Sequence, residues 1–368
     1  MTNVVLRGKP DAGNPHVRFD EGDVAPSATP RCETLLYSRR DFLKGTACVG
    51  AIASVAGKSV AGVAQAESVE QGKDIGKAKA LPPGRYDEHI HIYDDTEPKP
   101  EAFAARMAEA GMTGGCVFSR EQAPSARLAK TTRMTPEQIV DNVIAWCSAS
   151  PTLYPFYWID PSRADAVELV DMAVEKGIYG FKVIRNNGMP ASGPALDAYR
   201  RIAHYGKPLT FHSGILYDGV PSSEFFRPVA FEPMLRVSRL RFCLAHISWP
   251  WCDECLAVFG KIRDSRWRLR DVRTGKMNED VPSMYIDTTP GPRSIWRKDA
   301  LQKIYMTHFK DSIRDRLMFG TDNNVHSYRV QHCREFQNFD DALFREMGLT
   351  EEQVDSYYRK AMESFLFG

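Results

Sequence analysis

From Leu81 to the C-terminus, short segments of β-branched and aromatic residues alternate with amphipathic segments of helical periodicity. Strands that alternate with helices predict a parallel sheet, because parallel strands need long crossover connections. Eight such units predict an α/β fold in which the sheet closes into a single-domain (β/α)8 barrel. The predicted strands are 85–93, 114–119, 153–160, 178–184, 208–213, 241–247, 283–288 and 316–322.

Sequence signals for helix ends support this alternation. The residues Thr-Pro-Glu-Gln at 135–138 form a capping box with proline at the first helical position. Ile139, Val143 and Trp146 then recur on one helical face. Thr350 begins a second capping box ahead of the last predicted helix. These signals place helices after the predicted strands, as the barrel requires.

Composition and charge exclude several classes of protein. The chain has 368 residues, of which 43% are hydrophobic, and this is enough for a large core. A net charge of +1 gives no indication of a nucleic-acid partner. No glycine-rich phosphate loop follows the first strand, which disfavours a dinucleotide-binding oxidoreductase. Cys252 and Cys255 form an isolated C-x-x-C pair, interpreted as helix-face cysteines, with a disulfide between them as an open alternative.

The N-terminal segment has the pattern of an export signal. Arg39 and Arg40 precede a weakly apolar stretch rich in small residues, which ends in Ala64-Gln65-Ala66. The sequence S-R-R-D-F-L-K resembles the twin-arginine export signal, which implies a periplasmic location and the twin-arginine machinery as a partner. An uncleaved membrane anchor or a chance pair of arginines is the alternative. The predicted organisation is a disordered leader (1–37), the signal peptide (38–66), a linker (67–80) and the barrel (81–368).

Histidines and an aspartate lie at the ends of several predicted strands. His89 and His91 belong to the first strand, and residues two apart on a strand point to the same side. His212, His246 and Asp322 lie at the ends of the fifth, sixth and eighth strands. The C-terminal ends of barrel strands meet at one rim, which carries the active site in enzymes of this fold. An isolated histidine is commonly structural, but this combination predicts a metal site.

The same residues resemble the motifs of the amidohydrolase superfamily, and most closely its "amidohydrolase 2" group. The resemblance rests on H-x-H, Lys182 on the fourth strand, His212, His246 and Gly-Thr-Asp at 320–322. It runs from about Asp87 to the C-terminus and implies a metal-dependent barrel enzyme. The group includes hydrolases, lactonases and aromatic-acid decarboxylases. The group's usual N-A-x-x-L-F ending is replaced by K-A-M-E-S-F at 360–365.

This resemblance leads to a mechanistic hypothesis. One divalent metal is expected to be bound by His89, His91, His212 and Asp322, with zinc favoured over manganese or iron. Asp322 is expected to act as general base and His246 as a second acid/base or an oxyanion donor. The predicted activity is hydrolysis of an amide, ester or lactone through a metal-activated water. Decarboxylation of an aromatic or unsaturated carboxylic acid is the alternative, and a non-catalytic binding protein is a third possibility.

Several cationic and aromatic residues are predicted to contact a small, carboxylated substrate, because arginine pairs with carboxylates in a bidentate manner. Lys182 is ambiguous, since binuclear members of the superfamily use a carboxylated lysine at this position to bridge two metals. We favour one metal, with Lys182 as a substrate contact. The alternative is a strand-end lysine that extends its charged end into solvent. The predicted substrate residues are Lys182, Arg185, Arg120, Arg293, Trp249 and Tyr217. The basic segment 266–276 falls at the opposite rim and is interpreted as a solvated loop or a contact in a homo-oligomer.

Overall fold

The structure is a computed structural model, and most of the predicted barrel domain can be described from it. The predicted leader and signal peptide (1–66) and the predicted substrate residue Arg293 lie outside the described residues. Residues 72–368 are described, apart from 94–95, 122–133, 186, 271–272, 277, 279, 290–293 and 308–309.

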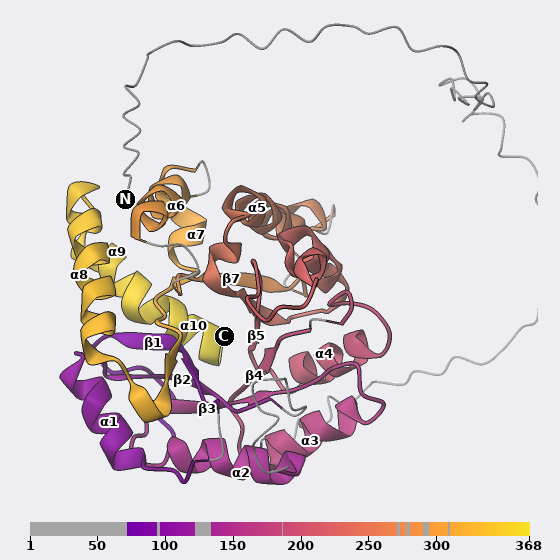
Figure 1. Cartoon of the computed structure of the whole chain (residues 1–368). Coiled ribbons are helices and arrows are strands. Elements are labelled where there is room, and N and C mark those ends of the chain that lie inside the picture. Colours follow the sequence, from indigo (N-terminus) through magenta and orange to yellow (C-terminus); the bar gives the residue numbers. More distant parts are fainter. Residues whose placement is uncertain are drawn as a thin grey trace, which may run out of the picture. The chain divides into compact units, whose positions relative to one another are not determined.

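A curled parallel sheet forms the centre of the molecule (Figure 1). Its strands lie in the order β8-β7-β6-β5-β4-β3-β2-β1-β9, and every neighbouring pair is parallel. All eight predicted strands are present, so the predicted TIM-barrel-like α/β fold is confirmed. The strands are β1 (Tyr86–His91), β2 (Gly114–Phe118), β3 (Leu153–Trp158), β4 (Gly180–Val183), β5 (Leu209–Phe211), β6 (Arg241–Leu244), β7 (Ser283–Asp287), β8 (Leu317–Met318) and β9 (Asn323–Asn324).

The segment from β8 to β9 closes the barrel. β8 pairs with β7, while β9 pairs with β1 on its other side. Between them, the carbonyl of Phe319 accepts a 2.9 Å hydrogen bond from the Glu88 N–H, and the Asp322 N–H donates to the carbonyl of His89 at 2.9 Å. One stretch of chain therefore joins the last strand to the first and fixes Asp322 beside His89.

Helices surround the sheet (Figure 1). Both predicted capping boxes, at Thr135 and Thr350, are confirmed, and Ile139, Val143 and Trp146 are buried as expected. The α-helices are α1 (Pro100–Glu109), α2 (Pro136–Trp146), α3 (Ala166–Lys176), α4 (Ala195–His204), α5 (Cys252–Arg268), α6 (Ser294–Met306), α7 (Lys310–Arg314), α8 (Val330–Glu346), α9 (Glu351–Asp355) and α10 (Ala361–Phe367). Shorter helical segments are η2 (Ser223–Phe226), η3 (Pro228–Arg236), η4 (Ala245–Ser248), η5 (Val325–Ser327) and the π-helical η6 (Ser356–Lys360).

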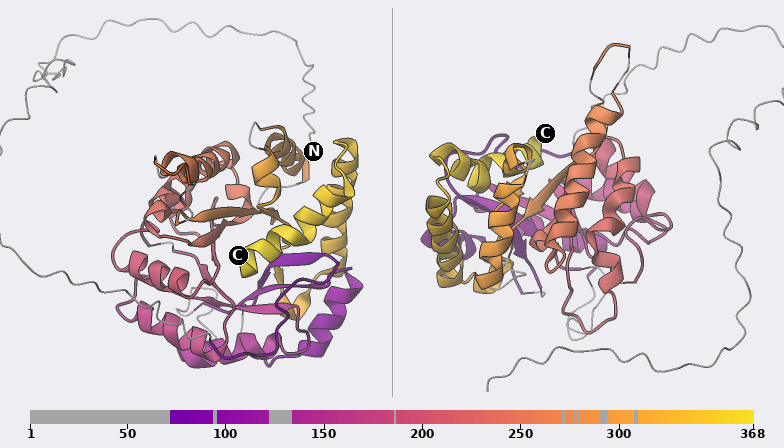
Figure 2. Two further views of the ribbon diagram at one scale, coloured as in Figure 1. Left: turned by 180° about the vertical axis from the view of Figure 1, so that it is seen from behind. Right: turned by 90° about the horizontal axis from the view of Figure 1, so that it is seen from above.

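Helix α10 covers one end of the barrel, as the left view of Figure 2 shows. Met362 and Phe365 of α10 belong to the same buried cluster as Phe156, Cys243 and Tyr285 from inside the barrel. A second and larger apolar cluster fills the layer between the sheet and the surrounding helices. Because α10 blocks the N-terminal ends of the strands, only their C-terminal ends are open to a substrate.

Three other features of the sequence can be placed. Residues of the predicted linker lie against the barrel, where the Lys77 ammonium donates to the carbonyl of Ser150 at 2.8 Å. Cys252 and Cys255 are both free thiols. No helix among the described residues is long and apolar enough to cross a membrane.

The described residues of the predicted basic segment lie beyond the body of the barrel. The right view of Figure 2 shows that the end of α5 and the turn after it project on the side where the C-terminus lies. Trp267 and Leu269 are exposed there. This is the rim opposite the C-terminal strand ends, as the sequence predicted, so the segment is remote from the candidate site.

A buried ion pair links α6 to α8. The Arg297 guanidinium donates to both carboxylate oxygens of Asp340, at 2.7 and 2.6 Å, and both side chains are fully buried. The Tyr357 hydroxyl also donates to Asp340, at 2.7 Å. An exposed pair, Lys298–Glu346, joins the same two helices at the surface.

We predict that Asp340→Asn will lower the free energy of unfolding by about 3–5 kcal/mol, because it leaves the buried Arg297 charge uncompensated. Glu346→Gln, which breaks the exposed pair between the same helices, should cost about 0–1 kcal/mol. Urea denaturation followed by circular dichroism measures both values. Equal costs for the two variants would contradict the prediction.

Candidate metal centre

A bulge in β1 directs several of its polar side chains. The pairing of β1 with β2 shifts in register between Asp87 and Ile90. Glu88 consequently reaches Thr210 on β5, whose hydroxyl donates to it at 2.6 Å, and the neighbouring His89 reaches Asp287 on β7 at 2.9 Å. Adjacent residues of a regular strand point to opposite faces, so the bulge allows both to face the barrel interior.

Three donor atoms converge at the open end of the barrel: Nε2 of His89, Nε2 of His91 and a carboxylate oxygen of Asp322. The two nitrogens are 2.9 Å apart, and Oδ1 of Asp322 lies 3.3 Å from His91 Nε2 and 3.8 Å from His89 Nε2. All three donors lie within 4.8 Å of one another. Bonds of about 2.0–2.2 Å from zinc to nitrogen and oxygen are compatible with ligands at this spacing.

Lys182 lies directly beside these donors. Its ammonium nitrogen is 3.2 Å from His89 Nε2 and sits over the Phe118 ring, and the side chain is fully buried. Burial lowers the pKa of Lys182, although the nearby Asp287 and Glu88 act in the opposite direction. The alternative that this lysine extends its charged end into solvent is therefore wrong.

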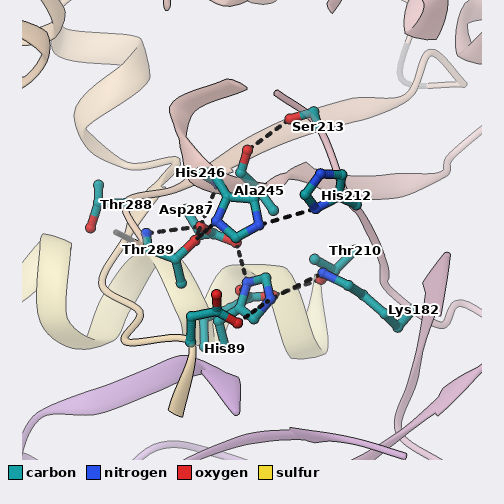
Figure 3. A network of polar contacts seen from close by, with 12 residues as sticks. His89, Lys182, Thr210, His212, Ser213, Ala245, His246, Asp287, Thr288 and Thr289 are labelled. Atoms are coloured by element: carbon teal, nitrogen blue, oxygen red, sulfur yellow. Dashed lines mark hydrogen bonds and ion pairs between the residues drawn. The ribbon is translucent and has the colours of Figure 1, made fainter. Parts of the chain in front are cut away.

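His212 and His246 form a second group beside the first (Figure 3). His246 Nε2 is 3.2 Å from His212 Nδ1, and the rings of His246 and His89 lie 5.0 Å apart between centroids. His246 Nδ1 contacts the hydroxyl of Thr289 at 2.7 Å. The structure thus brings His246 between His89 and His212, while the tight group of donors contains only His89, His91 and Asp322.

The pKa values of His89, His91, His212 and His246 are all lowered, which favours the neutral imidazoles. Burial is the main cause, and neighbouring positive groups add to it: the pKa of His91 and that of His212 lie well below their usual value, and the pKa of His246 falls to about 4. The pKa of His89 is lowered by burial and by Lys182. A neutral imidazole keeps one nitrogen lone pair, which is the form that binds a metal.

These residues fit a divalent metal ion. Two neutral imidazoles and a carboxylate converge, and this donor chemistry suits zinc and its neighbours. The buried Nε2 of His212 has no hydrogen-bond partner among the described residues. A buried polar atom without a partner is costly, so this nitrogen is available for a ligand. His89, His91 and Asp322 form the candidate site, and His212 as a fourth ligand stays a prediction.

Aromatic rings surround the donors. Tyr93 stacks on His91 with 4.8 Å between ring centroids, and Trp158 meets the same ring edge-on at 5.9 Å. Phe226 packs against His212 at 4.9 Å. The Tyr93 hydroxyl is 3.5 Å from Oδ1 of Asp322, and this side chain is partly exposed at the mouth. The mouth of the site therefore offers flat apolar surfaces to a substrate.

The predicted substrate residues are dispersed around this rim. Arg120 is buried at the end of β2, whereas Tyr217 is 68% exposed on the loop after β5. Arg185 donates to the carbonyls of Met189 and Ser192 in its own loop. Trp249 is partly buried and its N–H donates to the carbonyl of His246. The role of each residue in substrate binding stays a prediction.

Asp287 is the main site residue that the sequence reasoning missed. It is fully buried at the end of β7 and contacts both His89 and His246. Burial opposes its ionisation, but His89, His246 and Lys182 hold the pKa of Asp287 well below its usual value. An acidic residue at the end of an apolar strand was a usable signal, and it is the signal that had singled out Asp322.

Glu88 and Cys243 lie close to Asp287, with their donor atoms within 4.8 Å of one another. Burial and the neighbouring Asp287 raise the pKa of Glu88 well above its usual value. Asp287 already accepts hydrogen bonds on both oxygens. This buried group is therefore interpreted as support for the candidate site and not as a second metal site.

A family model described as Amidohydrolase matches residues 86–361. The chain belongs to the Amidohydrolase family. This match spans β1 to the start of α10 and contains all the residues of the candidate site.

Solved structures with a similar fold share little sequence with this amidohydrolase. The amidohydrolase 2 of Bifidobacterium longum subsp. infantis is 15% identical, with a TM-score of 0.45, over 74% of this chain and 98% of that chain. An amidohydrolase of Pseudomonas aeruginosa is 11% identical, with a TM-score of 0.45, over 77% and 95% of the two chains. The dihydroorotase of Campylobacter jejuni is 15% identical, with a TM-score of 0.44, over 76% and 81%. No curated protein matches the sequence.

We predict that His91→Ala will strongly lower the affinity for zinc. Removal of a group that only supports a ligand typically costs about 10–100-fold, and removal of the ligand itself should cost more. His204→Ala, at an exposed position on α4, is the matched control and should bind zinc like the unaltered chain. Elemental analysis measures the zinc content of the purified chain, and competition with a chelating dye measures its affinity for zinc. Normal zinc binding by a folded His91→Ala variant would exclude the site.

Proposed function

We propose that this member of the Amidohydrolase family is an exported, metal-dependent hydrolase that cleaves an amide, ester or lactone bond in a small, carboxylated substrate. The observation that supports this most is the convergence of His89, His91 and Asp322 at the open end of the barrel. We propose His212 as the fourth ligand, and zinc as the ion. A metal held by these residues would polarise the scissile carbonyl and would lower the pKa of a water molecule toward about 7.

Asp322 is the proposed general base. Its side chain is 35% exposed, so the carboxylate lies between the buried imidazoles and solvent. Its backbone has a φ of 57°, a left-handed conformation that aspartate tolerates better than most residues. The Asp322 N–H bond to the His89 carbonyl holds it there. In the proposed reaction Asp322 accepts the proton of the attacking water and delivers it to the leaving group.

Lys182 and His246 have supporting roles in this proposal. The Lys182 ammonium lies beside His89, where it stabilises negative charge that develops on the substrate oxygen. Both ring nitrogens of His246 already have partners, in Thr289 and His212. We therefore propose that His246 acts on the site through His212, in place of the acid/base role that its strand-end position suggested.

A carboxylated substrate fits the charge and shape of the rim. Arg120 is the buried arginine at the end of β2, and a buried guanidinium favours a carboxylate partner. Tyr93 and Trp158 add apolar surface close to the scissile bond. We propose that Arg120 orients the substrate carboxylate while these rings contact its body.

We predict that Asp322→Asn, assayed at saturating zinc, will lower kcat by about 100- to 10,000-fold, the range expected for loss of a general base. Asp197→Asn, at an exposed surface position, is the control. The assay offers esters, lactones and amides with and without a carboxylate, in ¹⁸O-labelled water. Label in the new carboxyl group supports hydrolysis, whereas carbon dioxide release from a carboxylated aromatic compound would replace the hydrolase by a decarboxylase.

The export part of the proposal rests on the N-terminal sequence. Arg39 and Arg40 precede a weakly apolar stretch that ends in a small-x-small pattern. We propose that the twin-arginine machinery exports the folded chain to the periplasm. Folding before export allows the metal to be bound in the cytoplasm, where its supply is controlled.

We predict that the double substitution Arg39→Lys and Arg40→Lys will abolish export, because the machinery recognises the arginine pair. Arg7→Lys and Arg18→Lys in the leader are the matched control and should leave export intact. Fractionation of bacterial cells, followed by immunodetection of the chain, measures the distribution. Unchanged periplasmic protein in the double variant would contradict twin-arginine export.

A further inference from the structure

Asp287 accepts hydrogen bonds from four donors. Its Oδ2 accepts from His89 Nδ1 at 2.9 Å. Its Oδ1 accepts from the backbone N–H of His246 at 2.9 Å, from the backbone N–H of Thr289 at 3.0 Å, and from the Thr289 hydroxyl. Three hydrogen bonds onto one oxygen, two of them from backbone N–H groups that can only donate, stabilise the ionised carboxylate, which accepts on both oxygens.

The bond from His89 fixes where that ring carries its proton. Because Asp287 only accepts, Nδ1 of His89 must be the protonated nitrogen. A neutral imidazole has one N–H, so Nε2 of His89 carries the lone pair. Nε2 is the atom that faces His91 and Asp322 in the candidate metal centre.

The same reasoning extends through Thr289 to His246. The Thr289 hydroxyl has one proton, and its bond to Asp287 uses it. The Thr289 oxygen therefore accepts from Nδ1–H of His246, 2.7 Å away. This leaves the lone pair of His246 on Nε2, which faces Nδ1 of His212 at 3.2 Å.

His212 completes the chain. Since Nε2 of His246 can only accept, Nδ1 of His212 must donate to it, and the lone pair of His212 lies on Nε2. That atom is buried and has no hydrogen-bond partner among the described residues. Two independent observations therefore agree: the hydrogen-bond chain assigns a lone pair to the one nitrogen of His212 that lacks a partner.

We infer that Asp287 is a positioning residue for two metal ligands at once, holding His89 directly and His212 through Thr289 and His246. Figure 3 shows this chain of contacts, with Asp287 between His89 on one side and Thr289 and His246 on the other. The inference depends on the metal centre of the proposed function and not on the bond that the enzyme cleaves. Partners that orient a ligating histidine are known to raise metal affinity by fixing its tautomer.

The backbone at His246 supports this inference. His246, Ile247 and Ser248 have positive φ values of 62°, 50° and 54°. A positive φ is strained for a residue other than glycine, and a β-branched residue like Ile247 is especially unfavourable there. Ser213 holds the turn by donating to the carbonyl of Ala245 at 2.7 Å. The strained turn places both the N–H and the ring of His246 against Asp287 and Thr289.

A substitution at Thr289 tests the connection from Asp287 to His212, which runs through Thr289 and His246. Thr289→Val removes the hydroxyl and keeps the shape, and we expect zinc affinity to fall by about 10–100-fold. Thr289→Ser keeps the hydroxyl, so its loss of zinc affinity should be much smaller than the loss in the valine variant. Competition with a chelating dye measures both. An equal loss in both variants would show that the Thr289 hydroxyl does not determine the zinc affinity and would overturn the inference.

Nitrogen-15 NMR of the imidazole rings tests the assignment directly and needs no substitution. In the metal-free chain, His89, His246 and His212 should all carry their proton on Nδ1. In Thr289→Val, His212 should lose this preference while His89 keeps it, and in Asp287→Asn both should lose it. A proton on Nε2 of His212 in the unaltered chain overturns the inference, even if every variant fails to fold. Neither zinc affinity nor the NMR assignment depends on turnover. Both results therefore test the inference even if the enzyme catalyses a reaction other than hydrolysis.

Discussion

The hydrogen bonds that join the chain after β8 to β1 are the contacts on which the site depends. They close the sheet through Phe319 and Asp322, so the first and last strands lie side by side. Without this closure, Asp322 would have no reason to lie near His89 and His91, which are more than 200 residues earlier in the chain. Closure also leaves only one open end, because α10 covers the other.

The interior of the barrel is organised by charge as well as by packing. Near α10 the interior is apolar, with Phe156 and Tyr285 in one cluster. Toward the open end it holds Lys182, Glu88 and Asp287, all fully buried. Buried charges are tolerated only when they are paired and hydrogen-bonded. Asp287 meets this condition through its hydrogen bonds to His89, His246 and Thr289, so one carboxylate holds three site residues.

The hydrogen bonds among the imidazoles determine which ring nitrogen each histidine presents to the metal site. A histidine can present either nitrogen to a metal, and the choice depends on what the other nitrogen contacts. Asp287 makes that choice for His89, and Thr289 and His246 extend it toward His212. The strain in the turn at His246 is consistent with a site whose geometry has been favoured over local backbone stability.

The sequence alone predicted the eight strands, the capping boxes and the residues of the metal-binding group, because periodicity and strand-end position are local properties. The family match confirms the resemblance to amidohydrolases that these motifs indicated, while the metal ligands stay a prediction. The tertiary structure decided what depends on distance across the barrel: the bulge at Glu88 and His89, the burial of Lys182, and the role of Asp287. A lone aspartate at a strand end has the same appearance in sequence whether it faces solvent or four donors. Only the folded chain brings those donors together, since they come from residues scattered over three strand ends.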